Sequence, residues 1–218
     1  MTDGSEVVQL QEALTEKDLG VLMDPSLSFK QHITAIATEA SQKVGMIWRT
    51  FNHMDEEMFL LLYKPLVRQK LEVAHVVWKP RWKCDLLTLE GVQRKATRMV
   101  KDLRDLSYAE RLEKLCLQSV EYRLNRGDMI ECWKLLNGKY DSAFPWLIPD
   151  YDSNLRSNGR KLKKLRFESA TKRKVFSTRV VEVWNKLPPS VVLAPSIDSF
   201  KSRLDHHWKD QWYTHSME

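Results

Sequence analysis

Residues 54–103 constrain the fold more than any other stretch of the chain. Their first half is apolar at so many positions that a helix formed there has few polar sides, and such a helix is a buried one. The apolar positions are Met58, Phe59, Leu61, Leu62, Leu66 and Val67. Trp78 and Pro80 are expected to end this helix, because the residue before a proline is pushed out of helical geometry. Pro65 removes a backbone donor, so we expect a bend or a split between residues 61 and 65.

The second half of this stretch, residues 86–104, predicts an amphipathic helix. At about 100° per residue its apolar side chains fall in one stripe. That stripe is formed by Leu89, Val92, Ala96, Met99, Val100 and Leu103. Arg94, Arg98 and Lys101 fall on the opposite side, with Lys95 flanking them. A buried helix braced against a helix with one basic face is a scaffold suited to gripping a polyanion, and it carries no visible catalytic chemistry.

The flanking segments predict a mainly helical protein with a small β-hairpin near the N-terminus. Residues 6–13 and 18–24 are expected to form the two strands. Ser28 and Gln31 fit a capping box that opens a helix towards Phe51. Further helices are expected to begin at Asp55, Ser107, Ser119 and Ser196. Gly138 is expected to end the helix that Ser119 opens. Another helix is expected over residues 176–187, where the Pro188-Pro189 pair ends it.

Positive charge is concentrated in the C-terminal part of the chain. The whole chain has a net charge of +6, but residues 155–204 contain thirteen Lys and Arg against three acidic residues, a net charge of +10. The densest run consists of Arg160, Lys161, Lys163, Lys164, Arg166, Lys172, Arg173 and Lys174. A patch of this kind suits a nucleic acid or an anionic membrane surface, and a solvated face is the plainer alternative. The same run fits a nuclear-import signal.

Other functional classes find little support. No secretory signal is expected at the N-terminus, and no apolar run reaches the ~18 residues of a membrane span. Cys84, Cys116 and Cys132 are odd in number and far apart, which favours free thiols in a reducing, intracellular compartment. His206 and His207 would point about 100° apart on a helix, so a surface pair is favoured over a metal site.

The tryptophans divide into two kinds. Trp48, Trp78, Trp133 and Trp184 lie on apolar stripes or at helix ends and are expected in the core. Trp82, between Arg81 and Lys83, is the best candidate to stack on a nucleic-acid base.

Short blocks in a fixed order extend over nearly the whole chain. They include Glu16-Lys17-Asp18-Leu19-Gly20-Val21, Leu62-Tyr63-Lys64, Leu66-Val67-Arg68, Val77-Trp78, Val92-Gln93-Arg94-Lys95-Ala96-Thr97, Glu110-Arg111-Leu112, Arg126-Gly127-Asp128, Asn137-Gly138, Arg179-Val180-Val181, Trp184-Asn185 and Leu187-Pro188. In their order and spacing, the chain resembles the C-terminal end of reverse transcriptases from non-LTR (LINE-type) retrotransposons of the Jockey-like kind.

This resemblance implies an organisation and a partner. Residues 1–27 would be the residual hairpin of a polymerase palm, 28–138 a thumb-like helical domain, 139–159 a linker and 160–218 a basic helical extension. The partner it implies is RNA or an RNA–DNA duplex, gripped without sequence specificity. The candidate contacts are Arg94, Lys95, Arg98, Lys101 and the eight basic residues from Arg160 to Lys174.

The resemblance also bears on catalysis. Polymerase chemistry needs paired carboxylates that hold Mg²⁺, and in the family these form an Asp-Asp pair in the palm. The sequence contains no Asp-Asp, so we expect no polymerase activity and no cofactor for this chain alone. Three other interpretations stay open: a self-associating or protein-interaction module, a fragment without a selected role, and a polymerase completed by a palm-containing partner.

Overall fold

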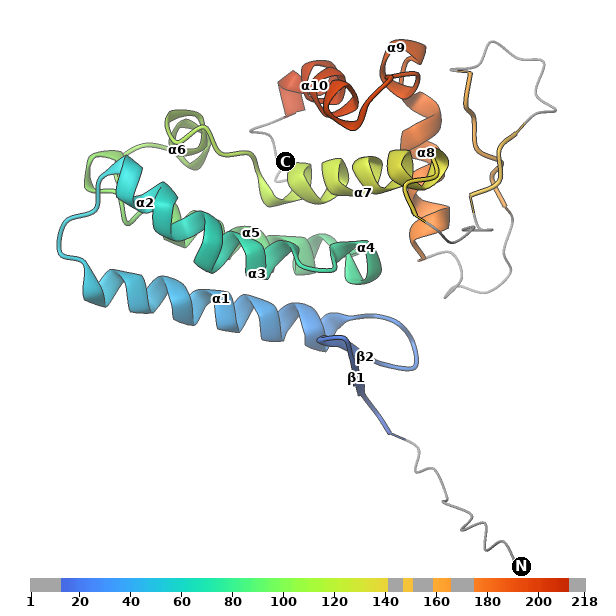
Figure 1. Ribbon diagram of the computed structural model, residues 1–218. Helices are drawn as coiled ribbons and strands as arrows, with labels where there is room; N and C mark the ends of the chain where they lie inside the picture. The colour runs from blue at the N-terminus through green and yellow to red at the C-terminus, as the bar shows by residue number, and fades with distance from the viewer. Residues whose placement is uncertain (1–12, 141–146, 151–158, 166–174, 212–218) are drawn as a thin grey trace, which may run out of the picture.

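Helices packed around two adjoining hydrophobic clusters make up most of the molecule, and a two-stranded antiparallel hairpin lies near the N-terminus (Figure 1). The structure is a computed structural model that describes residues 13–140, 147–150, 159–165 and 175–211. In these ranges no helix is both long enough and apolar enough to cross a membrane.

The hairpin is shorter than predicted, and it lies nearer in sequence to the first helix than the predicted hairpin did. Strand β1 (Glu16–Asp18) pairs with β2 (Val21–Met23). Leu19 and Gly20 form the turn with φ values of 44° and 88°. Two positive φ angles in a two-residue turn suit the twist of a hairpin, and glycine adopts them readily. The prediction of the first strand at residues 6–13 is therefore wrong for this hairpin, and residues 6–12 lie outside the described ranges.

Helix α1 (Lys30–Thr50) begins without the predicted Ser28–Gln31 capping box. Instead, the Asp24 carboxylate accepts hydrogen bonds from the backbone N–H groups of Ser28 and Phe29, each at 3.0 Å. A carboxylate is a stronger acceptor than a hydroxyl, so it organises the loop ahead of the helix. Partial burial opposes the charge of Asp24, but hydrogen bonds from the hydroxyls of Ser26 and Ser28, together with the two backbone bonds, hold its pKa well below its usual value.

The predicted irregularity at Pro65 is confirmed and takes the form of a π-helical segment (Lys64–Arg68) between α2 (Glu56–Tyr63) and α3 (Gln69–Glu72). These three segments form one continuous helical rod, and one side of it is fully buried at every fourth residue. These residues are Phe59, Tyr63, Val67 and Leu71. Four residues exceed one α-helical turn by about 40°, so three such steps would rotate the stripe by about 120°. The wider π turn counteracts that drift and keeps the stripe on the core.

Two features of this central region differ from the prediction. The rod is not buried on all sides, because Leu61 is 72% exposed. The helix also breaks at Ala74, whose φ is 54°, before α4 (His75–Trp78). The Val73 carbonyl accepts a hydrogen bond from Trp78 Nε1 at 2.7 Å, so a side chain takes the place of a helical backbone donor there.

Helix α5 (Lys83–Thr97) ends earlier than the predicted residue 104. The chain turns after Arg98 and forms a 3₁₀ turn at Lys101–Leu103. Val100 and Leu103 remain buried after the turn. Because a 3₁₀ turn has 3.0 residues, it keeps residues three apart on one side and preserves the apolar period across the break. The pattern alone therefore could not place the helix end.

The remaining helices begin where their capping residues predict. Ser107 and Glu110 form a capping box at α6 (Tyr108–Lys114), and Ser119 caps α7 (Val120–Leu136). Helix α8 (Phe176–Lys186) ends before the two prolines, the second of which opens α9 (Pro189–Val192). Ser196 caps α10 (Ile197–His207), which a 3₁₀ turn (Lys209–Gln211) follows. Gly138, with φ 60°, follows the end of α7.

Helix α7 contributes to both hydrophobic clusters. Val120 and Leu124 pack with α1, α2, α3 and α5, whereas Met129 and Trp133 pack with α8, α9 and α10. The clusters thus meet within α7. The second cluster also contains Leu147 and Leu162, carried by two extended segments joined at the Pro149–Leu162 bridge.

Three of the four tryptophans expected in the core are there. Trp78, Trp133 and Trp184 are at most 2% exposed. Trp48 is 51% exposed, so its prediction is wrong. It lies near the C-terminal end of α1, beyond the last buried residue of that helix, Ile47.

Candidate nucleic-acid interface

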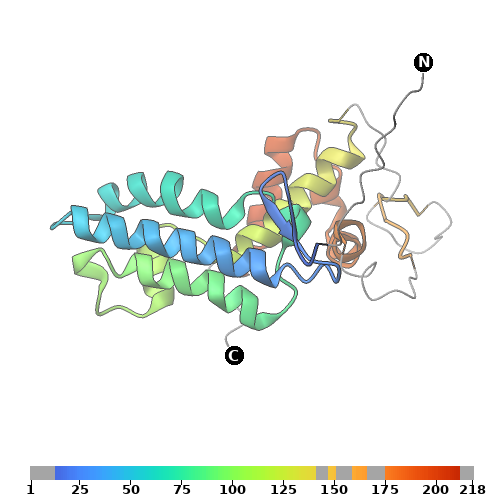
Figure 2. The ribbon, with the colours of Figure 1, turned by 90° about the horizontal axis from the view of Figure 1, so that it is seen from below.

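The predicted basic residues that the structure describes lie at two opposite ends of the molecule. Arg94 and Lys95 are in the last turn of α5, Arg98 caps its end, and Lys101 is on the following 3₁₀ turn. The segment 159–165 lies far from there, beside α8 (Figures 1 and 2). Arg166, Lys172, Arg173 and Lys174 lie outside the described residues. The structure therefore does not join the two predicted groups into one face.

The segment 159–165 is tied down by its backbone. Leu162 exchanges hydrogen bonds with the Asn185 side chain at 2.9 and 2.8 Å, and the Arg160 carbonyl accepts one from Trp184 Nε1 at 2.8 Å. Lys164 forms an ion pair with Glu182. Arg160 Nη1 donates to Asn137 Oδ1 at 2.8 Å. Two of the four cations described here, Arg160 and Lys164, are thus already engaged by neighbouring side chains, while Lys161 and Lys163 are not ion-paired within the described ranges.

A second group of cations gathers where α1 and α5 end. We call it the α5 cationic end, and it consists of Arg49, Lys95, Arg98, Lys101 and Arg104. All five side chains are exposed, and within the described ranges none forms an ion pair with a carboxylate. Arg104 Nε donates to the Arg98 carbonyl at 3.2 Å, and its guanidinium carbon lies 5.0 Å from the centre of the Trp48 ring. Arg49 and Arg104 were not identified from the sequence.

Two further arginines raise the positive charge of this end. The Arg94 guanidinium lies 4.9 Å from the centre of the Tyr108 ring. Arg111 is buried and donates to Thr97 Oγ1 at 3.0 Å. Burial, with the neighbouring charges of Arg98 and Arg94, lowers the pKa of Arg111. Burial is the main cause of this shift, and the positive charges of Arg98 and Arg94 add to it.

A groove of about 570 Å³ runs between α1 and α5, with Arg49 and Lys95 among its lining residues. Its walls carry small or polar side chains such as Ser41, Gln42 and Thr88. Gly91 leaves it open, since a Cβ added there would have no atom within 4 Å. An open wall of this kind lets an extended polar ligand approach the helix backbone closely.

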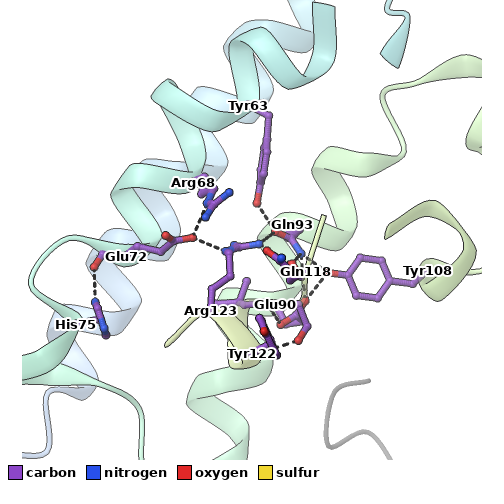
Figure 3. A network of polar contacts seen from close by, with 12 residues as sticks. Tyr63, Arg68, Glu72, His75, Glu90, Gln93, Tyr108, Gln118, Tyr122 and Arg123 are labelled. Atoms are coloured by element: carbon purple, nitrogen blue, oxygen red, sulfur yellow. Dashed lines mark hydrogen bonds and ion pairs between the residues drawn. The ribbon is translucent and has the colours of Figure 1, made fainter. Parts of the chain in front are cut away.

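A buried polar network holds α5 in the orientation that turns these cations outward (Figure 3). Gln93 Nε2 donates to the Tyr108 hydroxyl at 2.9 Å and to the Gln118 carbonyl at 3.0 Å. Arg123 Nη1 donates to Gln93 Oε1 at 2.8 Å, and Arg123 also pairs with Glu72. These contacts join α5 to α3, α6 and α7.

The other carboxylate of the network lies one turn before Gln93. Glu90 accepts hydrogen bonds from the Tyr108 hydroxyl and from the Val120 backbone N–H. Most polar groups of this network have partners, which makes the network rigid, whereas the buried Arg123 Nη2 has none among the described residues. Sequence reasoning missed it, although polar Glu90, Gln93 and Thr97 occur at spacings that place them beside the apolar stripe of the same helix.

No metal site accompanies this surface. In the part of the chain that the structure describes, no three His, Cys, Asp or Glu side chains gather as a metal would need.

Comparisons with other proteins give no further guide. No protein-family model, no curated protein and no solved structure matches this chain.

Proposed function

We propose that the chain binds the backbone of RNA or of an RNA–DNA duplex, without sequence specificity, at the α5 cationic end and along the adjoining groove. The proposal follows the resemblance to the template-gripping C-terminal part of a non-LTR retrotransposon reverse transcriptase. It includes no catalytic step. The observation that carries it is the group of five exposed cations without carboxylate partners in the described ranges.

The number of charges supports a ligand rather than internal compensation. Two helices end here, and each helix C-terminus carries roughly half a negative charge. The two termini together offset about one positive charge. Asp102 and Asp105 lie on the same turn, so five cations stand against two carboxylates and the helix ends. Among these groups an excess of about two positive charges is left, to which Arg94 and Arg111 add, and phosphate groups are suited to neutralise it.

Fluorescence anisotropy with a labelled RNA–DNA duplex tests this proposal. Neutralising five phosphates gives a slope of log K against log salt near −4.5, which is an affinity loss of about 500-fold between 50 and 200 mM salt. We expect similar affinity for unrelated sequences, because no element is placed to read base edges.

Two double variants that reverse charge, one at the proposed site and one elsewhere, provide the test and its control. The double variant Lys95→Glu/Arg98→Glu should abolish binding at 50 mM salt. The double variant Lys30→Glu/Lys209→Glu changes the net charge by the same amount on exposed residues elsewhere, which form no ion pair within the described ranges, and should bind nearly as the parent does. Equal losses in both variants, or no binding by the parent at low salt, would sink the proposal.

Self-association is the second candidate function, and one observation favours it. Exposed apolar side chains occur on the turn of the hairpin, on α2, just after α3 and on α4. They are Leu19, Leu61, Val73 and Val77, which are 95, 72, 64 and 50% exposed. Exposed apolar surface of this kind is typical of an interface. Sedimentation equilibrium tests this candidate. An apparent molecular mass that rises with protein concentration, together with a monomeric mass for Leu61→Glu, would support it.

A further inference from the structure

The turn between α4 and α5 is bordered by two cavities that no part of the proposed backbone contact uses. Their volumes are about 260 and 300 Å³. Both are lined by Lys79, Pro80, Arg81 and Asn125. Trp82 lines only the first and Arg179 only the second. The two cavities therefore lie on either side of one short turn.

The charge of these cavities is positive. Four cations line them, Lys79, Arg81, Lys83 and Arg179, against two carboxylates, Glu121 and Asp128. The Asp128 carboxylate is already bound by Lys79 and Arg179. Arg81 is exposed and has no ion pair within the described ranges, so its guanidinium is available to an anion.

Trp82 gives the turn an exposed aromatic surface. Its side chain is 59% exposed, and the guanidinium carbon of Arg81 lies 5.7 Å from the centre of its ring. An indole has two faces, and a cation over one of them leaves the other available for stacking. Aromatic side chains beside cations are how proteins hold unpaired nucleotides, because every base has a π face and every linkage a phosphate.

Asn125 adds a directed donor between the two cavities. Its Oδ1 accepts a hydrogen bond from Lys79 Nζ at 2.6 Å, which fixes the orientation of the amide. The Nδ2 group donates to no residue within the described ranges. An amide NH₂ held in this way can donate to a phosphate oxygen or a base carbonyl.

We infer that this turn binds an unpaired nucleotide, with its base stacked on Trp82 and its phosphate held by Arg81 and Asn125. The inference rests on the proposed function for its geometry. From Trp82 to Lys95 helix α5 advances about 20 Å, the length of roughly six base pairs. Exposed residues Cys84, Thr88 and Gly91 form a continuous side of the helix between the two sites. A duplex of about six base pairs held at the α5 cationic end would thus have its end, and any overhang, at Trp82.

Duplexes with and without a two-nucleotide overhang test the inference. By anisotropy, the parent should bind the overhang duplex roughly 5- to 100-fold more tightly than the blunt one, the range that stacking of one base provides. Trp82→Ala should erase this difference and leave the blunt affinity unchanged. Trp48→Ala is the matched aromatic control, because Trp48 is also exposed but lies on α1 beside Arg104 of the α5 cationic end, far from the turn. Its loss acts on both duplexes alike and should keep the difference between them.

A second readout separates this inference from the proposed function. A 2-aminopurine in the overhang, or in a free 5′-phosphorylated trinucleotide, should be quenched on binding, and Trp82→Ala or Arg81→Gln should restore its fluorescence. Quenching of the trinucleotide without any duplex binding would retain the nucleotide site and reject the groove. Duplex binding with no overhang preference, or a preference that survives Trp82→Ala, would overturn the nucleotide site and retain the groove.

Discussion

Arg179 on α8 and Asp128 on α7 form a two-point ion pair, with Nη2 2.9 Å from Oδ1 and Nε 3.0 Å from Oδ2. Lys79, just after α4, adds a third cationic contact, its Nζ lying 2.7 Å from Oδ2. Arg179 also donates to the Val76 carbonyl at 2.6 Å. One buried carboxylate therefore holds three helices together at the junction of the two hydrophobic clusters.

Replacing Asp128 by asparagine should destabilise the protein strongly. The substitution leaves Lys79 and Arg179 without a compensating charge, and breaking a buried ion pair in this way costs about 3–5 kcal/mol. Urea denaturation monitored by tryptophan fluorescence measures the change. Asp198→Asn is the control, since Asp198 is 85% exposed and pairs only with Lys201, so its loss should not be measurable. Equal effects of the two substitutions would contradict the role assigned to Asp128.

Stability should fall in two stages as the pH decreases. Burial outweighs the nearby Asp128 charge and lowers the pKa of His75 below 6.5. Burial alone would raise the pKa of Asp128, but Arg179 and Lys79 hold it below 3.8. Each group therefore binds its proton more readily in the unfolded chain, and the stability it contributes above its unfolded pKa is lost below it.

The first stage should begin near pH 6.5 and the second near pH 3.8. Thermal denaturation from pH 8 down to pH 3 follows both. Burial also lowers the pKa of His32, so His75→Gln should reduce the first stage and His32→Gln/His75→Gln should remove it. A flat profile between pH 8 and pH 5 in the parent would refute this assignment.

Two helical glycines should respond to alanine in opposite directions. A Cβ at Gly127 would overlap His75 Nε2 and lie 2.6 Å from its Cε1, whereas a Cβ at Gly91 would meet nothing within 4 Å. Alanine adds about 1 kcal/mol of helix propensity at either position. At Gly127 overpacking, which costs about 1–3 kcal/mol, should exceed that gain. We expect Gly91→Ala to raise the melting temperature and Gly127→Ala to lower it, as calorimetry would record.

Arg49 should contribute to nucleic-acid binding, although it lies on α1. It lines the same groove as Lys95, so Arg49→Gln should reduce the slope of log K against log salt by about 0.9. Lys163→Gln, at the far end of the molecule, should leave the slope unchanged. A response of Lys163 equal to that of Arg49 would mean that the ligand does not follow the groove.

Local signals in the sequence predicted local structure well. Asp55, Ser107, Ser119 and Ser196 all cap helices, because a capping hydrogen bond involves only residues three positions apart. The capping box at Ser28 does not form, because Asp24 accepts hydrogen bonds from both the backbone N–H and the hydroxyl of Ser28. The end of α5 was misplaced because the apolar period continues through the 3₁₀ turn.

The candidate site was predicted only in part, because it is assembled from distant segments. Lys95 and Arg98 follow from the periodicity of α5. Arg49 and Arg104 join them only because α1 packs on α5 and the chain turns back after Leu103. Nothing in their own neighbourhoods marks them. The four residues of the 160–174 run that the structure describes lie elsewhere, since density of charge in a sequence does not fix where a segment packs.

Because α7 supplies side chains to both hydrophobic clusters, no loop exists at which the described chain divides into two self-sufficient halves. A cut after Gly138 would leave Met129 and Trp133 facing water, and a start after Gly138 would strip α8 and α10 of the surface on which they pack. Truncated proteins that end or begin at Gly138 should therefore aggregate or unfold at a lower temperature than the full chain. The full chain should unfold in a single cooperative transition.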